Sequence, residues 1–139
     1  MKLEALLLDT CAVIWLVEGS DLAEAAVGAI DAAFDNGTPL NISPVTAWEI
    51  GVLAARGRFK SPLSPQCWFQ RLLDLPGIRL ADMPPEVLIG SSLLPGNPPR
   101  DPADRIIAAT VREYGYTLVT RDRTLLDYGG DGHMIVLPC

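Results

Sequence analysis

The sequence predicts an α/β fold with a central parallel sheet flanked by helices, and three observations carry this prediction. Short apolar runs that suit buried strands alternate with longer stretches of helical periodicity. Helix start and stop signals, such as Ser43-Pro44 and Asn36-Gly37, fall between these segments. The 139 residues, 49% of them hydrophobic, suit a single domain spanning 1–139. Strand–helix alternation favours three layers, with helices on both faces of the sheet.

The first half of the chain is expected to begin with a strand. Leu3 to Leu8 is a short apolar run of the kind that is buried on both faces of a sheet. Asp9 or Thr10 can cap the helix that follows, and Ser43-Pro44 pairs an N-cap residue with proline at the first helical position. The predicted elements are a strand at 3–8, a helix to 17, a helix at 21–34, a strand at 40–42 and a helix at 43–55.

The second half continues the alternation. Asp101-Pro102 starts a helix that ends at Tyr114-Gly115, after a proline-rich loop. Asp122, in Thr-Arg-Asp-Arg, is interpreted most simply as a turn residue. The predicted elements are helices at 65–73, 85–91 and 101–114, and strands at 78–80, 117–120 and 134–137.

The charge is divided unevenly along the chain. Residues 3–55 contain eight acidic and no basic residues, whereas ten basic and nine acidic residues follow from position 56. The net charge of -6 argues against nucleic-acid binding through general positive charge. Any contact with nucleic acid must then be local and assisted by cations. The acidic part also suits a basic partner segment, although it can equally serve solubility alone.

Several catalytic classes lack the residues that they need. The only histidine is His133, which excludes mechanisms that use paired histidines and leaves Cys11 without a base. A receiver-like phosphoacceptor domain needs a lysine after a late strand, but lysine occurs only at Lys2 and Lys60. These classes are therefore set aside.

The cysteines and the apolar runs bear on location. Cys11, Cys67 and Cys139 are odd in number and share no metal-ligand spacing, which predicts a reduced, cytoplasmic setting with Cys11 buried and Cys139 at a frayed terminus. Asp9 lies where a signal peptide would be most apolar. The apolar stretch at 12–17 is too short to span a bilayer, so no membrane partner is expected.

Four acidic residues are expected at one edge of the sheet. Asp9 follows the first predicted strand directly, and Asp122 follows the strand at 117–120. Asp104 lies in the first turn of the helix before that strand, and Glu49 lies in the helix after the second strand. Because sites in parallel sheets form beyond the carboxyl ends of the strands, these four positions can converge.

Each aspartate also has a structural interpretation. Asp9 can be a helix cap. Asp101-Pro-Ala-Asp104 resembles a capping box, and the helix dipole favours both acids there. Whether Asp101 or Asp104 is the chemically important acid stays open at this point.

Glu49 is harder to explain structurally. Val45, Trp48, Val52 and Leu53 form an apolar stripe that is expected to face the core, and Glu49 falls within it. A buried carboxylate needs a partner. Since no basic residue occurs between positions 3 and 55, a bound cation is the expected partner of the Glu49 carboxylate.

A cluster of carboxylates has a specific chemistry. The acids repel one another, which raises some of their pKa values unless a cation is bound. Mg²⁺ or Mn²⁺ prefers such oxygen ligands, and the metal can activate water and stabilise charge on phosphate oxygens. This inventory suits phosphodiester hydrolysis without His, Lys or a nucleophilic Ser.

Four motifs in order resemble those of the PIN-domain ribonucleases and, more narrowly, the VapC-type toxins of bacterial toxin–antitoxin pairs. The similarity extends from Leu6 to Leu137. The motifs are Leu8-Asp9-Thr10, Ser43-Pro-Val-Thr-Ala-Trp-Glu49-Ile, Asp101-Pro-Ala-Asp-Arg-Ile-Ile-Ala-Ala109 and Leu118-Val-Thr-Arg-Asp122.

The resemblance implies a PIN fold, divalent-metal endoribonuclease activity, a homodimer and neutralisation by a VapB-like antitoxin. By their positions in the motifs, Asp9, Glu49, Asp104 and Asp122 match the four catalytic acids of the family. Asp9 and Asp104 would be the principal metal ligands, and Glu49 and Asp122 would complete the shell or orient the attacking water.

Neighbouring polar groups are the expected contacts of the RNA substrate. The resemblance assigns the hydroxyls of Thr10 and Thr120 to holding ligands or phosphate. We further expect the basic residues that flank the acids to bind phosphates: Arg100, Arg105, Arg121 and Arg123. A second basic group, Arg56, Arg58 and Lys60, is as well explained by a solvated surface.

One departure from the family and one alternative function remain. Close relatives often carry His before the Asp-Pro of the third motif, whereas this loop reads Asn97-Pro98-Pro99-Arg100-Asp101, so no role of that His carries over.

The first two helices, with Trp15, Leu16 and Val17, are expected to contribute to an antitoxin groove, although Trp15 can also be core packing. The alternative function is a catalytically silent PIN-like protein-interaction domain.

Overall fold

One sheet of five parallel strands organises the fold. The computed structural model describes residues 5–19 and 21–139. In this part of the chain the strand order is β3-β2-β1-β4-β5, with every neighbouring pair parallel. The strands are β1 (Leu6–Leu8), β2 (Leu40–Ile42), β3 (Ile78–Leu80), β4 (Thr117–Thr120) and β5 (Ile135–Pro138).

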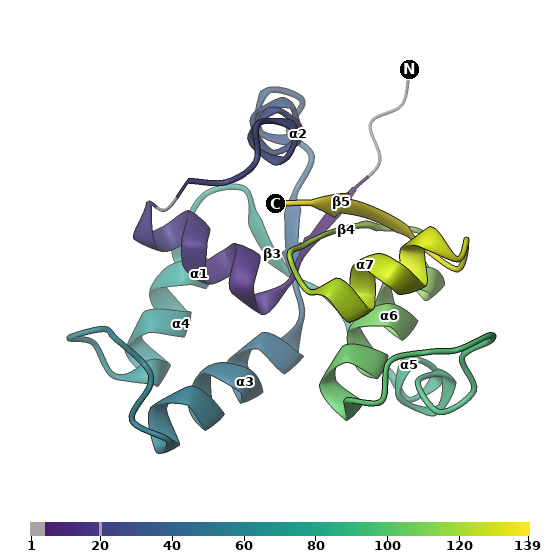
Figure 1. Ribbon diagram of the computed structural model, residues 1–139. Helices are drawn as coiled ribbons and strands as arrows, with labels where there is room; N and C mark the ends of the chain where they lie inside the picture. The colour runs from purple at the N-terminus through teal and green to yellow at the C-terminus, as the bar shows by residue number, and fades with distance from the viewer. Residues whose placement is uncertain (1–4, 20) are drawn as a thin grey trace.

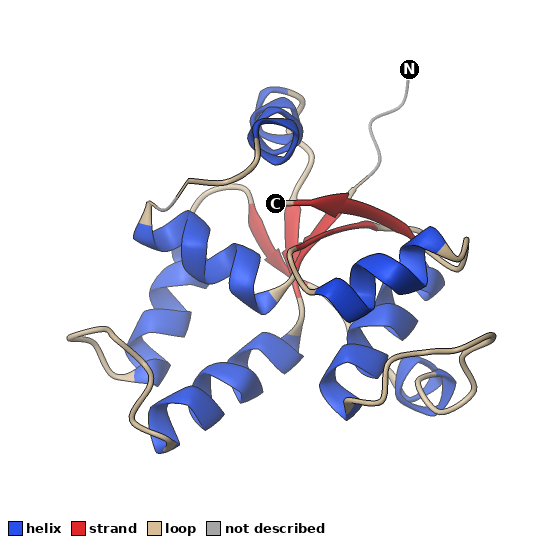
Figure 2. Ribbon diagram, viewed as in Figure 1, coloured by secondary structure: helices blue, strands red, loops and turns tan. Residues whose placement is uncertain are grey.

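Helices cover both faces of this sheet, which confirms the predicted fold class (Figure 2). Residues of α1–α4 pack in one hydrophobic cluster, and residues of α6 and α7 pack in the other. No helix in the described part of the chain is both long and apolar enough to cross a membrane. The helices are α1 (Thr10–Glu18), α2 (Glu24–Asp35), α3 (Pro44–Ala55), α4 (Pro65–Asp74), α5 (Pro85–Gly90), α6 (Pro102–Tyr114) and α7 (Arg123–Gly130).

The central strand β1 shows why the sequence forms this sheet. Successive side chains of a strand point to opposite faces. Leu6 and Leu8 accordingly join the cluster with α1–α4, and Leu7 joins the cluster with α6 and α7. Because both faces are covered, all three leucines are buried, and only an apolar run can occupy this position.

The starts of two elements differ from the prediction by more than one residue. The first strand begins at Leu6, and Leu3 and Glu4 of the predicted strand lie outside the described residues. The second helix begins at Glu24, three residues after the predicted Asp21. Ala23 takes its N-cap position without a side-chain hydrogen bond, so no local capping residue marks the start of this helix.

Helix α7 was not predicted at all. Its N-cap is Asp122, which the sequence suggested to be a turn residue, and it buries Leu125 and Tyr128 in the second core cluster. The helix is short and ends in Gly129-Gly130, two poor helix formers, which concealed its periodicity. Tertiary packing stabilises the helix in place of intrinsic propensity.

The C-terminus is also not frayed, contrary to the prediction for Cys139. Cys139 is 8% exposed and belongs to the first core cluster. Its backbone N–H donates to the Thr120 carbonyl at 3.1 Å, and its carbonyl accepts from Arg121 Nε at 2.9 Å. These bonds extend the pairing of β5 with β4 to the last residue. Cys11, predicted to be buried, is half-buried.

Candidate active site

Asp9 lies at the carboxyl end of β1 and caps α1. It is therefore both the helix cap and the acid at the strand end that the sequence suggested as alternatives. Its Oδ1 accepts from the Thr10 N–H at 2.7 Å, and its Oδ2 accepts from the Thr120 hydroxyl at 2.7 Å. The side chain is only 5% exposed. Burial raises the pKa of Asp9 despite these hydrogen bonds, and the charge of Asp122 raises it further.

Glu49 is held against α1 by a chain of hydroxyls. The Thr10 hydroxyl donates to Glu49 Oε1 at 2.6 Å. Thr10 Oγ1 also lies 3.1 Å from Thr46 Oγ1. Since the single Thr10 proton goes to Glu49, Thr46 is the donor in this second bond. Burial raises the pKa of Glu49, the Thr10 bond lowers it, and Asp9 raises it.

Of the apolar stripe that was predicted around Glu49, only Val45 is buried in the core. The buried face of α3 carries Val45, Thr46 and Ile50, whereas Trp48 is 56% exposed. Nearly every position of this helix is apolar, so the pattern has no marked amphipathic direction, and the packing of neighbouring helices selects the buried face. Glu49 therefore borders a pocket, not the core.

The two acids of the third motif, Asp101 and Asp104, lie in different surroundings. Asp101 caps α6 through a 2.8 Å bond from the Ala103 N–H to its Oδ1, and it is exposed. Asp104, one turn later, is half-buried. Burial, and to a smaller degree the charges of Asp122, Asp101, Asp9 and Glu49, together raise the pKa of Asp104 to about 7.

Thr120, at the end of β4, connects two of the acids. Its hydroxyl donates to Asp9 Oδ2 and accepts from the Asp122 N–H at 3.0 Å. Asp122 in turn caps α7, with Oδ1 accepting from the Leu125 N–H at 3.1 Å. A single buried hydroxyl thus fixes Asp9 relative to the start of α7.

The four predicted acids line one pocket of about 330 Å³ at the carboxyl edge of the sheet. The first turns of α1, α3 and α7 meet at this edge (Figure 1). Their positive dipole ends partly offset the acidic charge. As they stand, no three Asp, Glu, His or Cys side chains among the described residues are grouped to hold a metal ion. The lining residues are Asp9, Thr10, Cys11, Ile14, Glu49, Leu53, Asp104, Arg121 and Asp122.

Of the predicted phosphate-binding arginines, Arg121 lines this pocket. Its guanidinium lies 3.1 Å from the centroid of the Trp15 ring, and its Nη2 donates to the Asp21 carbonyl at 3.3 Å. With the bond to the Cys139 carbonyl, these contacts hold Arg121 against α1 and the C-terminus. Arg105 is half-buried, and the other two predicted arginines, Arg100 and Arg123, are exposed.

Two polar residues of the site were assigned no role from the sequence. Thr46 holds Thr10, and its signal was its position one helical turn before Glu49. The Cys11 thiol lies 3.6 Å from Asp9 Oδ2. Burial and the charge of Asp9 raise the pKa of Cys11 to about 12, so this residue is a neutral thiol and not a nucleophilic thiolate.

His133 lies outside the acid pocket and is explained by packing. Its ring stacks on Tyr128 at 4.7 Å, and a side chain at Gly96 would overlap it. The Tyr128 hydroxyl donates to the Pro95 carbonyl at 2.7 Å, which holds the proline-rich loop in place. The only histidine of the chain therefore supports the loop before α6.

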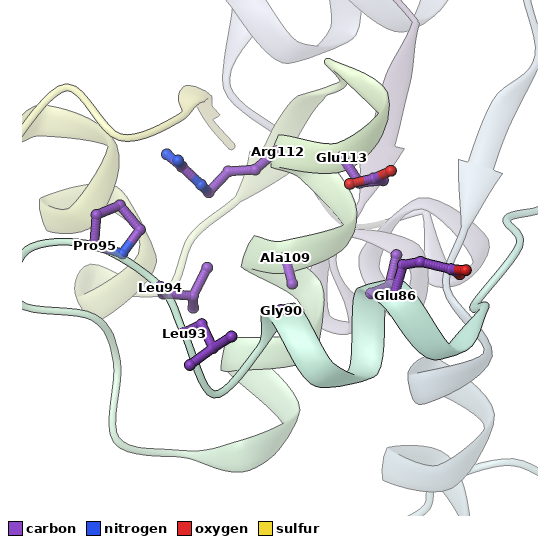
Figure 3. Close-up of a pocket in the computed structure, with 9 residues that line it drawn as sticks. Glu86, Gly90, Leu93, Leu94, Pro95, Ala109, Arg112 and Glu113 are labelled. Carbon is purple, nitrogen blue, oxygen red and sulfur yellow. The ribbon is translucent and has the colours of Figure 1, made fainter.

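A separate pocket of about 270 Å³ lies between α5, the loop after it and α6. Leu93 and Leu94 approach Ala109 there, and Glu86, Arg112 and Glu113 lie around its margin (Figure 3). None of the predicted site residues lines it, so it is not part of the acid pocket.

Comparison with known proteins gives one family. Residues 6–131 match the model of the PIN domain. Ribonuclease VapC22 of Mycobacterium tuberculosis is 34% identical over 111 residues, which cover 80% of this chain and 81% of that protein.

Solved structures share the fold at low sequence identity. VapBC2 from Rickettsia felis, bound to a DNA fragment from its promoter, aligns with a TM-score of 0.66 and 14% identity over 96% of this chain and 98% of that chain. A toxin–antitoxin complex from Klebsiella pneumoniae aligns with a TM-score of 0.62 and 21% identity over 96% of each chain. The match to the family model and the similarity to VapC22 show that the chain belongs to the PIN-domain family, among the VapC-type ribonucleases.

Proposed function

We propose that the protein is a divalent-metal-dependent endoribonuclease and the toxin of a toxin–antitoxin pair. The observation that carries this proposal is the convergence of Asp9, Glu49, Asp104 and Asp122 on one pocket. Similarity to a ribonuclease along most of the chain supports the reaction type. Similarity of the fold to proteins solved in toxin–antitoxin complexes is consistent with the biological role.

The donor set of the pocket suits Mg²⁺ or Mn²⁺. Carboxylates are the ligands these ions prefer. The pKa values of Asp9, Glu49 and Asp104 are raised mainly by burial and further by the charges of neighbouring acids, and a bound cation would offset both effects. We assign Asp9, Asp104 and Asp122 as the ligands. A cation held there supplies a Lewis acid that activates water and stabilises charge on phosphate oxygens.

The residues around the acids then have distinct tasks. Thr10 orients Glu49, whose free carboxylate oxygen can accept a proton from the attacking water. Thr120 orients Asp9. We assign phosphate binding to Arg100, Arg105, Arg121 and Arg123, with Thr10, which lines the pocket, as a further polar contact. Thr120, also predicted to contact the substrate, is fully buried and acts only by holding Asp9. If alanine at each arginine leaves RNA affinity and its salt dependence unchanged, this assignment is wrong.

We propose that the antitoxin groove predicted on α1 and α2 also takes in the surface between α1 and α4. A pocket of about 510 Å³ lies there, with Val17, Leu63, Trp68, Leu72 and Leu75 among its lining residues. An apolar antitoxin segment can fill such a hollow. A basic side chain of the antitoxin is expected to approach the carboxylates of the acid pocket.

We also propose a homodimer formed through α5 and the loop that follows it. Leu88, Ile89 and Leu93 are 40%, 64% and 74% exposed. Leu93 borders the pocket between α5 and α6 (Figure 3). Apolar side chains concentrated in this way are unusual on a monomer and are typical of contact surfaces.

The test is incubation of the purified protein with total RNA and Mg²⁺ or Mn²⁺, beside EDTA and an Asp9→Asn variant. Discrete cleavage that is lost in both controls is the expected result. Absence of cleavage together with absence of metal binding by calorimetry would instead support the alternative, a catalytically silent PIN-like interaction domain.

A further inference from the structure

Trp48 is an exposed aromatic residue directly beside the acid pocket. Of the three tryptophans in the chain, Trp68 is 8% exposed and Trp15 is half-buried under Arg121, whereas Trp48 is 56% exposed. Nothing in the core requires an indole at this position, because the buried face of α3 carries Val45 and Ile50. Trp48 immediately precedes Glu49, so the two side chains leave neighbouring points of the helix.

A second pocket begins at Glu49 and continues along α3. Its volume is about 370 Å³. Thr10, Glu49 and Leu53 line both this pocket and the acid pocket, so the two hollows share a wall. The lining residues are Thr10, Trp48, Glu49, Val52, Leu53, Arg56, Asp101 and Ala103.

The residues of this pocket are ordered by chemistry along the helix. Trp48, Val52 and Arg56 follow one another at intervals of four residues and therefore lie on one face. The face begins with an aromatic ring beside the carboxylates, continues with an apolar side chain, and ends with a cation. Arg56 lies about 12 Å beyond Trp48 along the helix axis, at 1.5 Å per residue.

This order fits an unpaired nucleotide strand better than a protein segment. A base has a planar face that stacks on an indole, and its phosphates need a cation. Directly at the carboxylates, a strand presents the phosphate that is to be cleaved, so bases next to it fall within reach of Trp48. The alternative occupant, an apolar protein segment, does not use Arg56.

We propose that Trp48 and Arg56 form a nucleotide-binding subsite next to the cleavage site, in which Trp48 stacks on an unpaired RNA base and Arg56 binds a neighbouring phosphate. This inference rests on the proposed ribonuclease function, because it takes RNA as the ligand. It assigns recognition to a surface that is separate from the metal-binding acids.

The test measures binding of a short oligouridylate to the Asp9→Asn protein with and without Trp48→Ala. Loss of the stacking platform is expected to weaken binding about tenfold. Trp48→Phe is expected to retain most of the affinity. An otherwise identical abasic oligonucleotide should bind both proteins equally, because it has no base to stack. Phe34→Ala, which removes a 48% exposed aromatic residue on α2, is the matched control and should have no effect.

Arg56→Ala gives the second measurement. The slope of log K against log salt for the oligouridylate should become shallower by about 0.7, the value for one phosphate contact on a single strand. An unchanged slope, or a Trp48→Ala affinity equal to that of the parent, overturns the proposal. The proposal is also overturned if Trp48→Ala weakens binding of the abasic strand as much as binding of the oligouridylate, because the loss would then reflect general damage to the protein.

Failure of this inference is distinguishable from failure of the proposed function. If the wild-type protein cleaves RNA with metal but Trp48→Ala binds normally, the subsite is wrong and the ribonuclease stands. If the Asp9→Asn protein does not bind the oligonucleotide and the wild type does not cleave RNA, both are wrong. If Trp48→Ala keeps RNA affinity but loses binding to the antitoxin, this face belongs to a protein partner.

Discussion

The Thr10 hydroxyl donates a 2.6 Å hydrogen bond to Glu49 Oε1 and so joins the first residue of α1 to the middle of α3. Thr10 follows Asp9, whose own carboxylate caps the same helix. The position of one carboxylate is therefore coupled to that of the other through two adjacent residues. Thr46 completes the link from the α3 side.

Thr10→Val should lower RNA cleavage by roughly 10- to 100-fold, because it removes a hydrogen bond to a charged group. Loss of that bond also removes a contribution that lowers the pKa of Glu49. The acidic limb of the pH–rate profile should therefore move to higher pH. Thr10→Ser should restore both the rate and the profile, and an unaltered profile in Thr10→Val would contradict the role given to Thr10.

Asp104→Asn should abolish the response of the protein to divalent metal. With metal at about 100 times its Kd, the wild type is expected to gain about 2.7 kcal/mol of unfolding free energy. Denaturant unfolding with Mn²⁺ or EDTA measures this difference, with Asp101→Asn as the matched control. Asp101 is an exposed cap in the same motif, and it should retain most of the metal effect. If Asp101→Asn abolishes the metal effect and Asp104→Asn retains it, Asp101 is the metal ligand of this motif and Asp104 is not.

The metal-free protein should become more stable as the pH falls from 8 to 6. Asp104 has a pKa of about 7 when folded and 3.8 as a model group, so between these values the folded state binds a proton that the unfolded state lacks. Unfolding free energy consequently decreases as pH rises through this window. The change should be at most about 1 kcal/mol for this half-buried group after solvent screening. Thermal melts of Asp104→Asn should show a flatter pH dependence, and a wild-type protein that loses stability on acidification to pH 6 would refute this.

Antitoxin binding should depend on α1. Trp15→Ala and Leu16→Ala are expected to weaken capture of the cognate antitoxin about tenfold, the effect of truncating a single contact residue at an interface. Trp15→Ala also removes the ring under Arg121, so its melting temperature must be measured beside the binding. Normal capture by both folded variants would exclude this groove.

The dimer should depend on the exposed apolar residues of α5 and its following loop. Ile89→Glu and Leu93→Glu place charges at positions that are 64% and 74% exposed, so the monomer should fold normally. Light scattering after size-exclusion chromatography should change from a dimeric to a monomeric mass. Ile135→Glu, at a 55% exposed position on β5, serves as the control. A dimer that survives both changes would place its interface elsewhere.

The fold class and most of the elements follow from local patterns in the amino-acid sequence. The leucines of β1 could be assigned to a buried strand because only an apolar run is compatible with a strand covered on both faces. Caps such as Ser43 and Asp101 marked helix starts through local chemistry, which needs no tertiary contact. The four acids could be proposed as a group because the ends of parallel strands share one edge.

Features that depend on neighbours far apart in the chain could be seen only in the folded structure. It selected the face of α3 that is buried, formed α7 by packing Leu125 and Tyr128, and buried Cys139 through its pairing with β4. It also distinguished the exposed cap Asp101 from the half-buried Asp104. Local patterns record propensity, but burial and pKa depend on which side chains the folded chain brings together.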